Sequence, residues 1–211
     1  MGKTWTKKTW TKTTWTGWSV STLLAWSIAI SALYLVSNPI AMTHHPVIAH
    51  HLDARPNAVY MHFIFSPFAL MIGIIQMLPA IRALAFIHGW IGRIYVLCCL
   101  VGAMGGVWLA PSSSSGVWGQ SGFGLLGIFW FSMTLRGYLS AREGDYEDHR
   151  SWMIRSYALT FAAVTLRIQL GIVGANGWDM SLFYPIIAWS CWLPNLILAE
   201  WWLAKDAKAA A

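Results

Sequence analysis

Six long apolar stretches constrain this chain more than any other feature of its sequence. Each can cross the roughly 30 Å hydrocarbon core of a bilayer as a helix, and none alternates with the period of two of a membrane β-strand. The stretches are 18–36, 58–78, 89–110, 118–140, 152–173 and 181–203. We therefore expect an all-α, polytopic integral membrane protein with about six transmembrane helices. It divides into an arm (1–17), one transmembrane domain (18–203) and a tail (204–211).

The composition excludes several classes of protein. Only 10% of the 211 residues are charged and 57% are hydrophobic, whereas a soluble domain carries about a quarter charged residues. Fifteen tryptophans favour a membrane interface, where an indole can be apolar and still donate its N–H group. A soluble enzyme, a disordered regulator and a nucleic-acid-binding module are thereby excluded, and the lipid bilayer is the first expected partner.

The positions of the basic residues predict the orientation. With six spans both termini lie on one side, and twelve lysines and arginines fall on or near that side. They are Lys3, Lys7, Lys8, Lys12, Arg82, Arg93, Arg136, Arg142, Arg150, Arg155, Lys205 and Lys208. Only Arg55 falls in an opposite loop. By the positive-inside rule, we expect both termini in the cytoplasm and the protein in a bacterial cytoplasmic (inner) membrane.

Four spans each carry one stripe of small and polar residues, the kind that membrane helices turn toward one another. The stripes are His62, Ser66, Ala69, Gly73 and Gln76; His88, Gly92, Tyr95, Cys99, Gly102 and Gly106; Gln120, Gly124, Gly127, Phe131 and Thr134; and His149, Met153, Ser156, Thr160, Ala163 and Arg167. We expect spans two to five to form a four-helix core, with spans one and six outside it. Pro67, Pro185 and Pro194 should kink their helices.

His88 and His149 begin two of these stripes at similar depth on the cytoplasmic side. Two histidines on neighbouring helices are what bis-imidazole ligation of haem b requires, and Arg93 and Arg155 could bind the haem propionates. Helix capping and headgroup contacts are the alternative for the histidines, and snorkelling is the alternative for the arginines. A quinone or proton-relay role also stays open.

Arg167 is the ionisable residue deepest in a span, and such groups are costly to bury. Its expected depth matches that of His62 in span two, so these residues, with Gln76, are candidates for a ligand cavity that takes a small anion. Pairing of Arg167 with backbone carbonyls or with Gln169 is the alternative.

A histidine-rich loop is expected at 37–57. His44, His45, His50 and His51 lie there, and clustered imidazoles suit zinc or copper. No H-E-x-x-H or H-x-x-E-H spacing is present. Solvated loop histidines are the alternative to a metal site.

The arm repeats tryptophan every five residues, at Trp5, Trp10 and Trp15, among lysines and threonines. Such an arm can lie on anionic headgroups. Together with the outer helices, it can instead dock a larger membrane complex.

One longer pattern resembles a known family. It consists of His62 and Gln76, His88-x3-Gly92-Arg93-x-Tyr95, Gly122-Phe123, and the run from His149 to Arg167. Over about 37–175 the chain is similar to the bacterial domain-of-unknown-function 2306 family of predicted membrane proteins. Members commonly have a basic residue after the third-span histidine, where this chain has Gly89. The resemblance implies a multi-span cytoplasmic-membrane protein and transfers no reaction. A looser likeness to four-helix b-type cytochromes rests on the histidines alone.

The sequence is therefore compatible with three functional classes. The first, which we favour at this point, is a non-catalytic accessory or binding subunit of a larger membrane complex. The second is a small b-type haem or quinone-linked redox protein that uses His88 and His149. The third is a small-anion transporter or sensor with a cavity at His62 and Arg167. No nucleophile–base arrangement or phosphate loop is present, so the sequence favours a protein that is not an enzyme.

Overall fold

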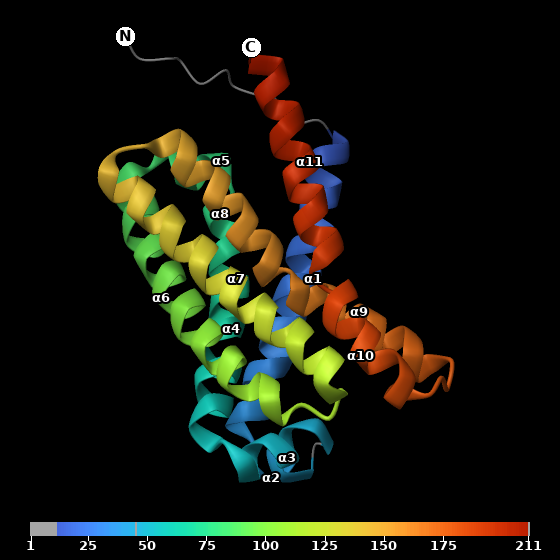
Figure 1. Ribbon diagram of the computed structural model, residues 1–211. Coiled ribbons are helices and arrows are strands. Elements are labelled where there is room, and N and C mark those ends of the chain that lie inside the picture. The colour runs from blue at the N-terminus through green and yellow to red at the C-terminus, as the bar shows by residue number, and fades with distance from the viewer. Residues whose placement is uncertain (1–11, 45, 211) are drawn as a thin grey trace.

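The computed structural model describes residues 12–44 and 46–210, with side chains from 16 to 44 and from 48 to 209. Every regular element in this part of the chain is a helix (Figure 1). In order they are α1 (Lys12–Ser37), α2 (Pro39–His44), α3 (Pro46–Ala54), α4 (Pro56–Gln76), α5 (Pro79–Ala83), α6 (Ala85–Leu109), η1 (Ala110–Ser112), α7 (Gly116–Glu143), α8 (Tyr146–Thr160), α9 (Ala162–Ala175), α10 (Met180–Ser190) and α11 (Leu193–Ala210). The expected all-α membrane fold is confirmed.

Each of the six expected spans is helical, as α1, α4, α6, α7, α8–α9 and α10–α11. In the described part of the chain, five of the six are long and apolar enough to cross a membrane. The exception is α7, whose six glycines and several hydroxyl side chains lower its mean hydropathy. It nevertheless runs through the bundle beside α6 and α8.

The expected four-helix core is present. Helix α4 packs on α6, α6 on α7, α7 on α8 and α8 on α4, so α6 and α8 lie diagonally across the bundle. Helix α1 lies outside against α4, while α10 covers α7 and α11 covers α8. Ten of the twenty-two stripe residues are buried, including Tyr95, Thr134, Ser156 and Thr160, and the other twelve are half-buried. Phe131, by contrast, lines an outer groove between α6 and α7.

Hydroxyl groups occupy the middle of the core. The Tyr95 hydroxyl lies 3.0 Å from both the Ser156 and the Thr160 hydroxyl oxygens. The Trp130 indole N–H donates to Thr160 at 2.8 Å, and Thr134 joins Ser156 at 2.7 Å. Because unpaired polar groups are costly away from water, this network holds α6, α7 and α8 in one rotational setting.

The fifth span contains a bend that the sequence did not predict. The helix is interrupted at Phe161, between α8 and α9, and α9 then turns away from the core beside α10 (Figure 1). Thr160 and Thr165 each donate their hydroxyl proton to the carbonyl four residues earlier, a bond that bends helices. The Asn195 amide secures the bend by donating to Ala158 O and Thr165 Oγ1.

The three prolines that were expected to kink their helices differ in their effect. Helix α4 continues through Pro67 and α10 through Pro185. Span six is instead broken at Cys191 and Trp192, and Pro194 is the second residue of α11. Proline is favoured there because the first turn of a helix needs no N–H donor.

The segment 37–57, expected to be a loop, is largely helical. It forms α2 and α3, and Pro39, Pro46 and Pro56 each occupy the first position of a helix, where the fixed φ of proline suits helix initiation. The Asn38 side chain accepts a hydrogen bond from the Ala41 N–H. The expected loop is thus replaced by two short helices that begin at prolines.

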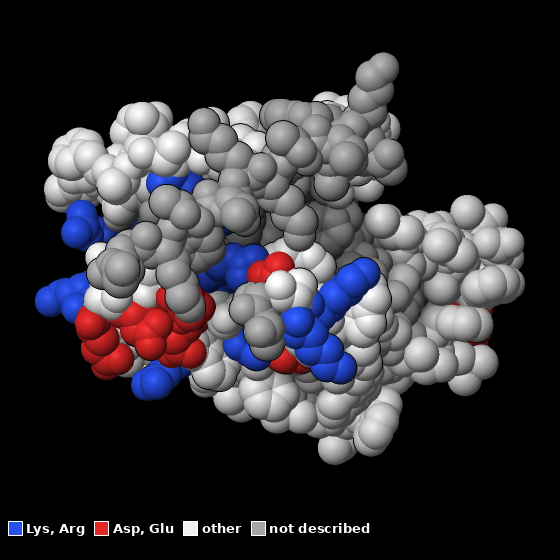
Figure 2. Space-filling model, turned by 90° about the horizontal axis from the view of Figure 1, so that it is seen from above, with Lys and Arg blue, Asp and Glu red and all other residues white. Residues whose placement is uncertain are grey.

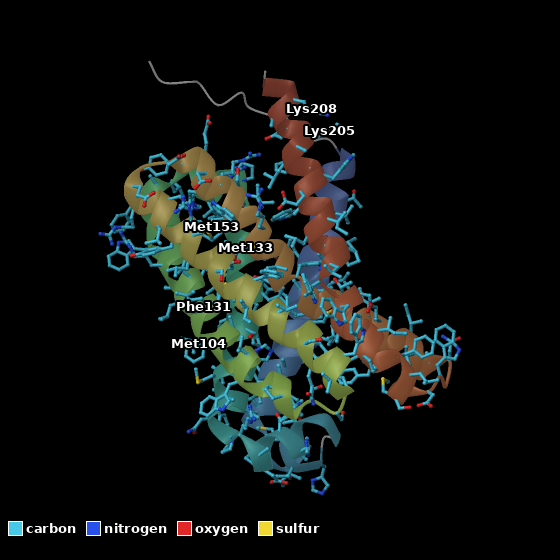
Figure 3. All side chains as sticks on the ribbon, viewed as in Figure 1. Met104, Phe131, Met133, Met153, Lys205 and Lys208 are labelled. Atoms are coloured by element: carbon cyan, nitrogen blue, oxygen red, sulfur yellow. The ribbon has the colours of Figure 1, made fainter. Side chains whose placement is uncertain are left out.

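The two ends of the bundle differ in charge. The basic end consists of α5, the α7–α8 connection and the last turns of α11, where Lys205 and Lys208 lie (Figure 3). Figure 2 looks onto this end and shows its Lys, Arg, Asp and Glu side chains gathered there. The opposite end consists of α2, α3 and η1 (Figure 1). The start of α1 and the end of α11 share the basic end, as six crossings require.

The outer faces of the helices are apolar. Large side chains such as Leu23, Leu97, Ile197 and Leu198 are more than half exposed. An open groove of about 440 Å³ between α6 and α7 is lined by Met104 and Phe131 (Figure 3) and by Val107, Trp108, Ile128 and Ser132. Such surfaces are stable in hydrocarbon and unfavourable in water, which supports contact with the lipid bilayer.

Candidate functional site

His88 and His149 lie side by side near the basic end of the bundle, and both are half-buried. They lie at the end of the first turns of α6 and α8, the two diagonal helices, with ring centroids 6.5 Å apart and ring planes at 86°. Two imidazoles that bind one metal ion have metal–nitrogen bonds of about 2 Å each. When the distance from each nitrogen to its ring centroid is added, the two centroids are expected to lie at about the separation observed here. The structure therefore brings together the two histidines that the sequence singled out.

The ring of His149 is held by a backbone carbonyl. Its Nδ1–H donates to Gly137 O on α7 at 2.7 Å. A Cβ at Gly137 would meet the sulfur of Met153 (Figure 3) at 2.7 Å, so glycine permits this close approach of α7 and α8. The bond leaves Nε2 available, and histidines that bind metals commonly donate their other N–H in this way.

Four buried polar side-chain atoms have no hydrogen-bond partner. They are the only such side-chain atoms among the residues that the structure describes, and all belong to α4, α6 or α8: Gln76 Oε1, His88 Nδ1, Trp152 Nε1 and Tyr157 Oη. The Gln76 amide nitrogen donates to His88 O at 2.9 Å. An unpaired buried polar group costs about 1–3 kcal/mol, so these atoms are candidates for contact with a polar ligand.

The arginines expected beside the histidines are engaged elsewhere. Arg93 is exposed and stacks on Trp90. Arg155 forms a two-pronged ion pair with Glu200 on α11 and stacks on Trp152. Arg82 on α5 is the cation that acts electrostatically on His88. Burial lowers the pKa of Arg82 and the charge of Arg150 lowers it further, yet an arginine stays protonated at neutral pH.

His62, Gln76 and Arg167 do not form one cavity. Gln76 belongs to the basic-end site, and fourteen residues along α4 separate it from His62, or about 21 Å. His62 donates its Nδ1–H to Gly102 O at 2.9 Å. Arg167 donates to Ala163 O at 3.2 Å, and Gln169 pairs with Ser190 rather than with Arg167.

The histidines of α2 and α3 do not converge on a metal site. No group of three or more His, Cys, Asp or Glu side chains suited to a metal occurs in the described part of the chain. His44 bonds to Ile40 O, and His50 lies beside His51 with ring centroids 5.7 Å apart. His45 lies outside the described residues.

His51 ties α3 to the turn that follows α6. Its buried ring bonds to Ser112 Oγ at 2.9 Å, and the Ser112 proton goes to Leu109 O. Burial lowers the pKa of His51 below its ordinary value of 6.5, as do the nearby His50 and Arg55. Folding thus favours the neutral ring, so its contribution to stability is full above pH 6.5 and is lost as the pH falls below that value.

We therefore expect thermal unfolding scans to show a smaller acid-induced loss of Tm in His51→Gln than in the native chain. Between about pH 7 and pH 5, the difference in the loss should be about 2–4 °C. The exposed His44 provides the matched control, His44→Gln, which should follow the native profile. Parallel profiles for His51→Gln and the native chain would contradict the prediction.

Sequence reasoning missed Arg82, Trp152, Tyr157 and Gly137 as parts of this site. A signal for two of them was present, because each histidine is followed by a tryptophan and then by Arg-x-Tyr (Arg93 to Tyr95 and Arg155 to Tyr157). No local pattern marks the Gly137 carbonyl, because it reaches His149 only when α7 packs on α8.

The fold defines this protein as a polytopic helical membrane protein with a polar core. The chain belongs to the predicted membrane protein family DUF2306, whose model matches residues 59–203. The resemblance carried by the histidine motifs is thereby confirmed, and the arm lies outside the match. No curated protein and no solved structure matches the chain significantly.

Proposed function

We propose that this chain is a small membrane redox protein that binds one b-type haem between His88 and His149. The observation that carries the proposal is the facing pair of imidazoles, 6.5 Å apart on diagonal helices. The bond from His149 Nδ1 to Gly137 O leaves Nε2 as its free ring nitrogen. The geometry favours this reading over the accessory role that the sequence favoured.

The unpartnered atoms support the same ligand. A haem offers a metal to two imidazoles and carboxylate oxygens to hydrogen-bond donors. The Trp152 N–H and the Tyr157 hydroxyl are buried donors without acceptors. Arg82 supplies positive charge near His88. These residues would hold and orient the group, which would supply one-electron chemistry.

The decisive experiment is a reduced-minus-oxidised visible spectrum of the full-length chain, purified in mild detergent from haem-replete cells. We expect a sharp b-type α-band with about one haem per chain. A flat spectrum from folded, monodisperse protein that also fails to take up added haemin would overturn the proposal. Extraction of a bound quinone from such protein would favour the quinone-linked alternative.

We further propose that the basic end faces the cytoplasm of a bacterial inner membrane, as the bias of basic residues indicates. The native cysteines are buried, so single introduced cysteines can report the topology. Ser114→Cys, in the exposed turn before α7, should react with an impermeant maleimide applied to intact spheroplasts. Glu143→Cys, at the end of α7, should react only after lysis. The reverse pattern would contradict the orientation.

An accessory role in a larger complex is a second proposal, favoured by one feature of α11. An exposed apolar stripe runs along the outer face of α11 and consists of Leu193, Ile197 and Trp201. Trp5 and Trp10 of the arm lie outside the described residues, as does the Trp15 side chain. Deleting residues 1–11 leaves α1 whole, so loss of co-purifying partners from this variant would support arm-mediated docking. Unchanged co-purification would contradict it.

A further inference from the structure

An open apolar groove lies on the outer face of the bundle, between α6 and α7. Its lining residues are Met104 and Phe131 (Figure 3), with Val107, Trp108, Ile128 and Ser132, and its volume is about 440 Å³. Sites that bind small molecules have volumes in this range. The Ser132 hydroxyl donates to Ile128 O at 2.7 Å within α7, so it is satisfied inside its own helix. The groove therefore offers hydrocarbon contact to its occupant.

The packing of α6 on α7 creates the groove and leaves it open. A Cβ at Gly127 would meet Val107 Cγ2 at 2.6 Å, so glycine lets the two helices approach closely there. The short side chain of Ser132 leaves space on the α7 side. Helices α1, α10 and α11 lie against α4, α7 and α8, whereas Met104 and Trp108 on α6 are 45% and 48% exposed. A molecule from the surrounding membrane can therefore reach the groove.

A cation lies at one end of this groove. The Arg55 guanidinium donates to Trp108 O, and the Trp108 side chain lines the groove. Arg55 directly precedes the candidate span that begins at Pro56, and Trp108 lies near the end of the candidate span that finishes at Ser112. Both residues thus lie at the depth where helices leave the hydrocarbon and lipid headgroups begin.

No acid neutralises Arg55 within the described part of the chain. The three ion pairs found there involve Arg136, Arg150 and Arg155. Asp53, two residues before Arg55, is exposed and forms no ion pair with it. The bond to Trp108 O uses one of the five N–H donors of the guanidinium. Arg55 therefore keeps its positive charge and further donors for a negatively charged group.

We propose that the groove binds one anionic phospholipid, of the phosphatidylglycerol type, from the leaflet at the α2–α3 end of the bundle. An apolar groove that ends at an uncompensated cation matches a molecule with a hydrocarbon chain and a negative head. The acyl chain lies against Met104 and Phe131, and the lipid phosphate accepts charge-assisted hydrogen bonds from Arg55. The Trp108 indole suits the boundary between chain and headgroup. This site is independent of the haem site.

The test is photo-cross-linking of the delipidated full-length chain in detergent, with phosphatidylglycerol that carries a diazirine in one acyl chain. Peptide mass spectrometry locates the cross-links, which we expect to concentrate on the α6 and α7 residues of the groove. Excess unlabelled phosphatidylglycerol should remove them. Phosphatidylcholine with the same chains should compete far less, because its choline cation offsets the phosphate charge. Cross-links spread evenly over exposed faces, including Leu97 and Ile197, would indicate ordinary boundary lipid and overturn the proposal.

Two variants separate the headgroup contact from the chain contact. Arg55→Gln can still donate to Trp108 O but lacks the charge, so groove cross-links at a lipid level below saturation should fall about tenfold. Ser132→Phe fills the groove and should abolish them. Arg142→Gln alters an exposed arginine at the basic end, and Ser121→Phe adds the same ring to an exposed serine of α7 outside the groove. Both controls should give the native yield.

Undiminished groove cross-links in Arg55→Gln or in Ser132→Phe would overturn the proposal. A chain that elutes as a dimer, with the groove labelled only after the dimer dissociates, would assign the groove to a second copy and would also overturn it. If Ser132→Phe does not fold, competition on the native chain decides the matter. Equal competition by the two unlabelled lipids excludes an anionic-headgroup site, and selective competition by phosphatidylglycerol supports it.

Discussion

Replacing His149 by alanine should abolish the b-type spectrum of the purified protein, and replacing His88 should do the same. Each substitution removes one of the two imidazoles that face each other at 6.5 Å. The partner histidine lies on a different helix and cannot supply both ligands. The measurement is haem per chain together with the reduced-minus-oxidised difference spectrum, for protein that elutes as a single species.

His44→Ala is the control for this pair. His44 is exposed and bonds to Ile40 O within α2, so its loss should leave the spectrum unchanged. Two folded alanine variants with native haem content would show that the haem is bound elsewhere. A graded result is also informative. Because the His149 ring is held by Gly137 O and His88 Nδ1 has no partner, any difference between the two variants should leave more haem in His88→Ala than in His149→Ala.

Replacing Gly105 by leucine should prevent stable packing of α4 on α6, the largest stability effect that we expect. A Cβ at this position would lie 2.7 Å from the His62 backbone nitrogen and 2.9 Å from Ala58 O. Backbone atoms cannot rotate away, so the two helices must separate. Even Gly105→Ala should lower the free energy of unfolding by about 1–3 kcal/mol, despite the better helix propensity of alanine.

Gly89 offers the matched control on the same helix, because a Cβ there meets nothing within 4 Å. Gly89→Ala should be neutral or should stabilise the protein by up to about 1 kcal/mol. The measurement is the unfolding temperature in detergent, with size-exclusion chromatography to detect aggregation. A Gly105→Leu variant that unfolds at the native temperature would contradict the observed contact between α4 and α6.

Part of the fold and site could be predicted from local sequence. The stripes placed Tyr95, Thr134 and Ser156 inside the bundle because small and polar groups avoid lipid. The stripe on α6 included Gly102 and Gly106 but not Gly105. It is Gly105, however, that lies closest to the backbone of α4. A period of three to four residues fixes a helix face only approximately, and neighbouring glycines compete for the contact.

Other features depended on contacts between distant segments. The segment 37–57 was expected to be a loop, yet helices begin at Pro39, Pro46 and Pro56. The bend at Phe161 depends on Asn195, thirty-four residues further along the chain, whose amide bonds to both sides of it. Arg93 was expected near the histidines from its position on α6. Its rotation places it over Trp90 on the outer face instead.

The sequence by itself determined that this chain is an all-helical membrane protein with a four-helix core, because apolar length and small-residue periodicity are local properties. It also singled out His88, His149 and Arg167, since ionisable groups are rare within apolar runs. Only the tertiary structure decided which polar groups meet. His88 lies opposite His149 because α6 and α8 are diagonal, and Gln76 joins them because it ends α4 at the same level. Arg167 lies beyond the bend at Phe161, where its hydrogen bond goes to Ala163 O of the same helix. These outcomes depend on helix rotation and bending, which arise from packing among distant residues.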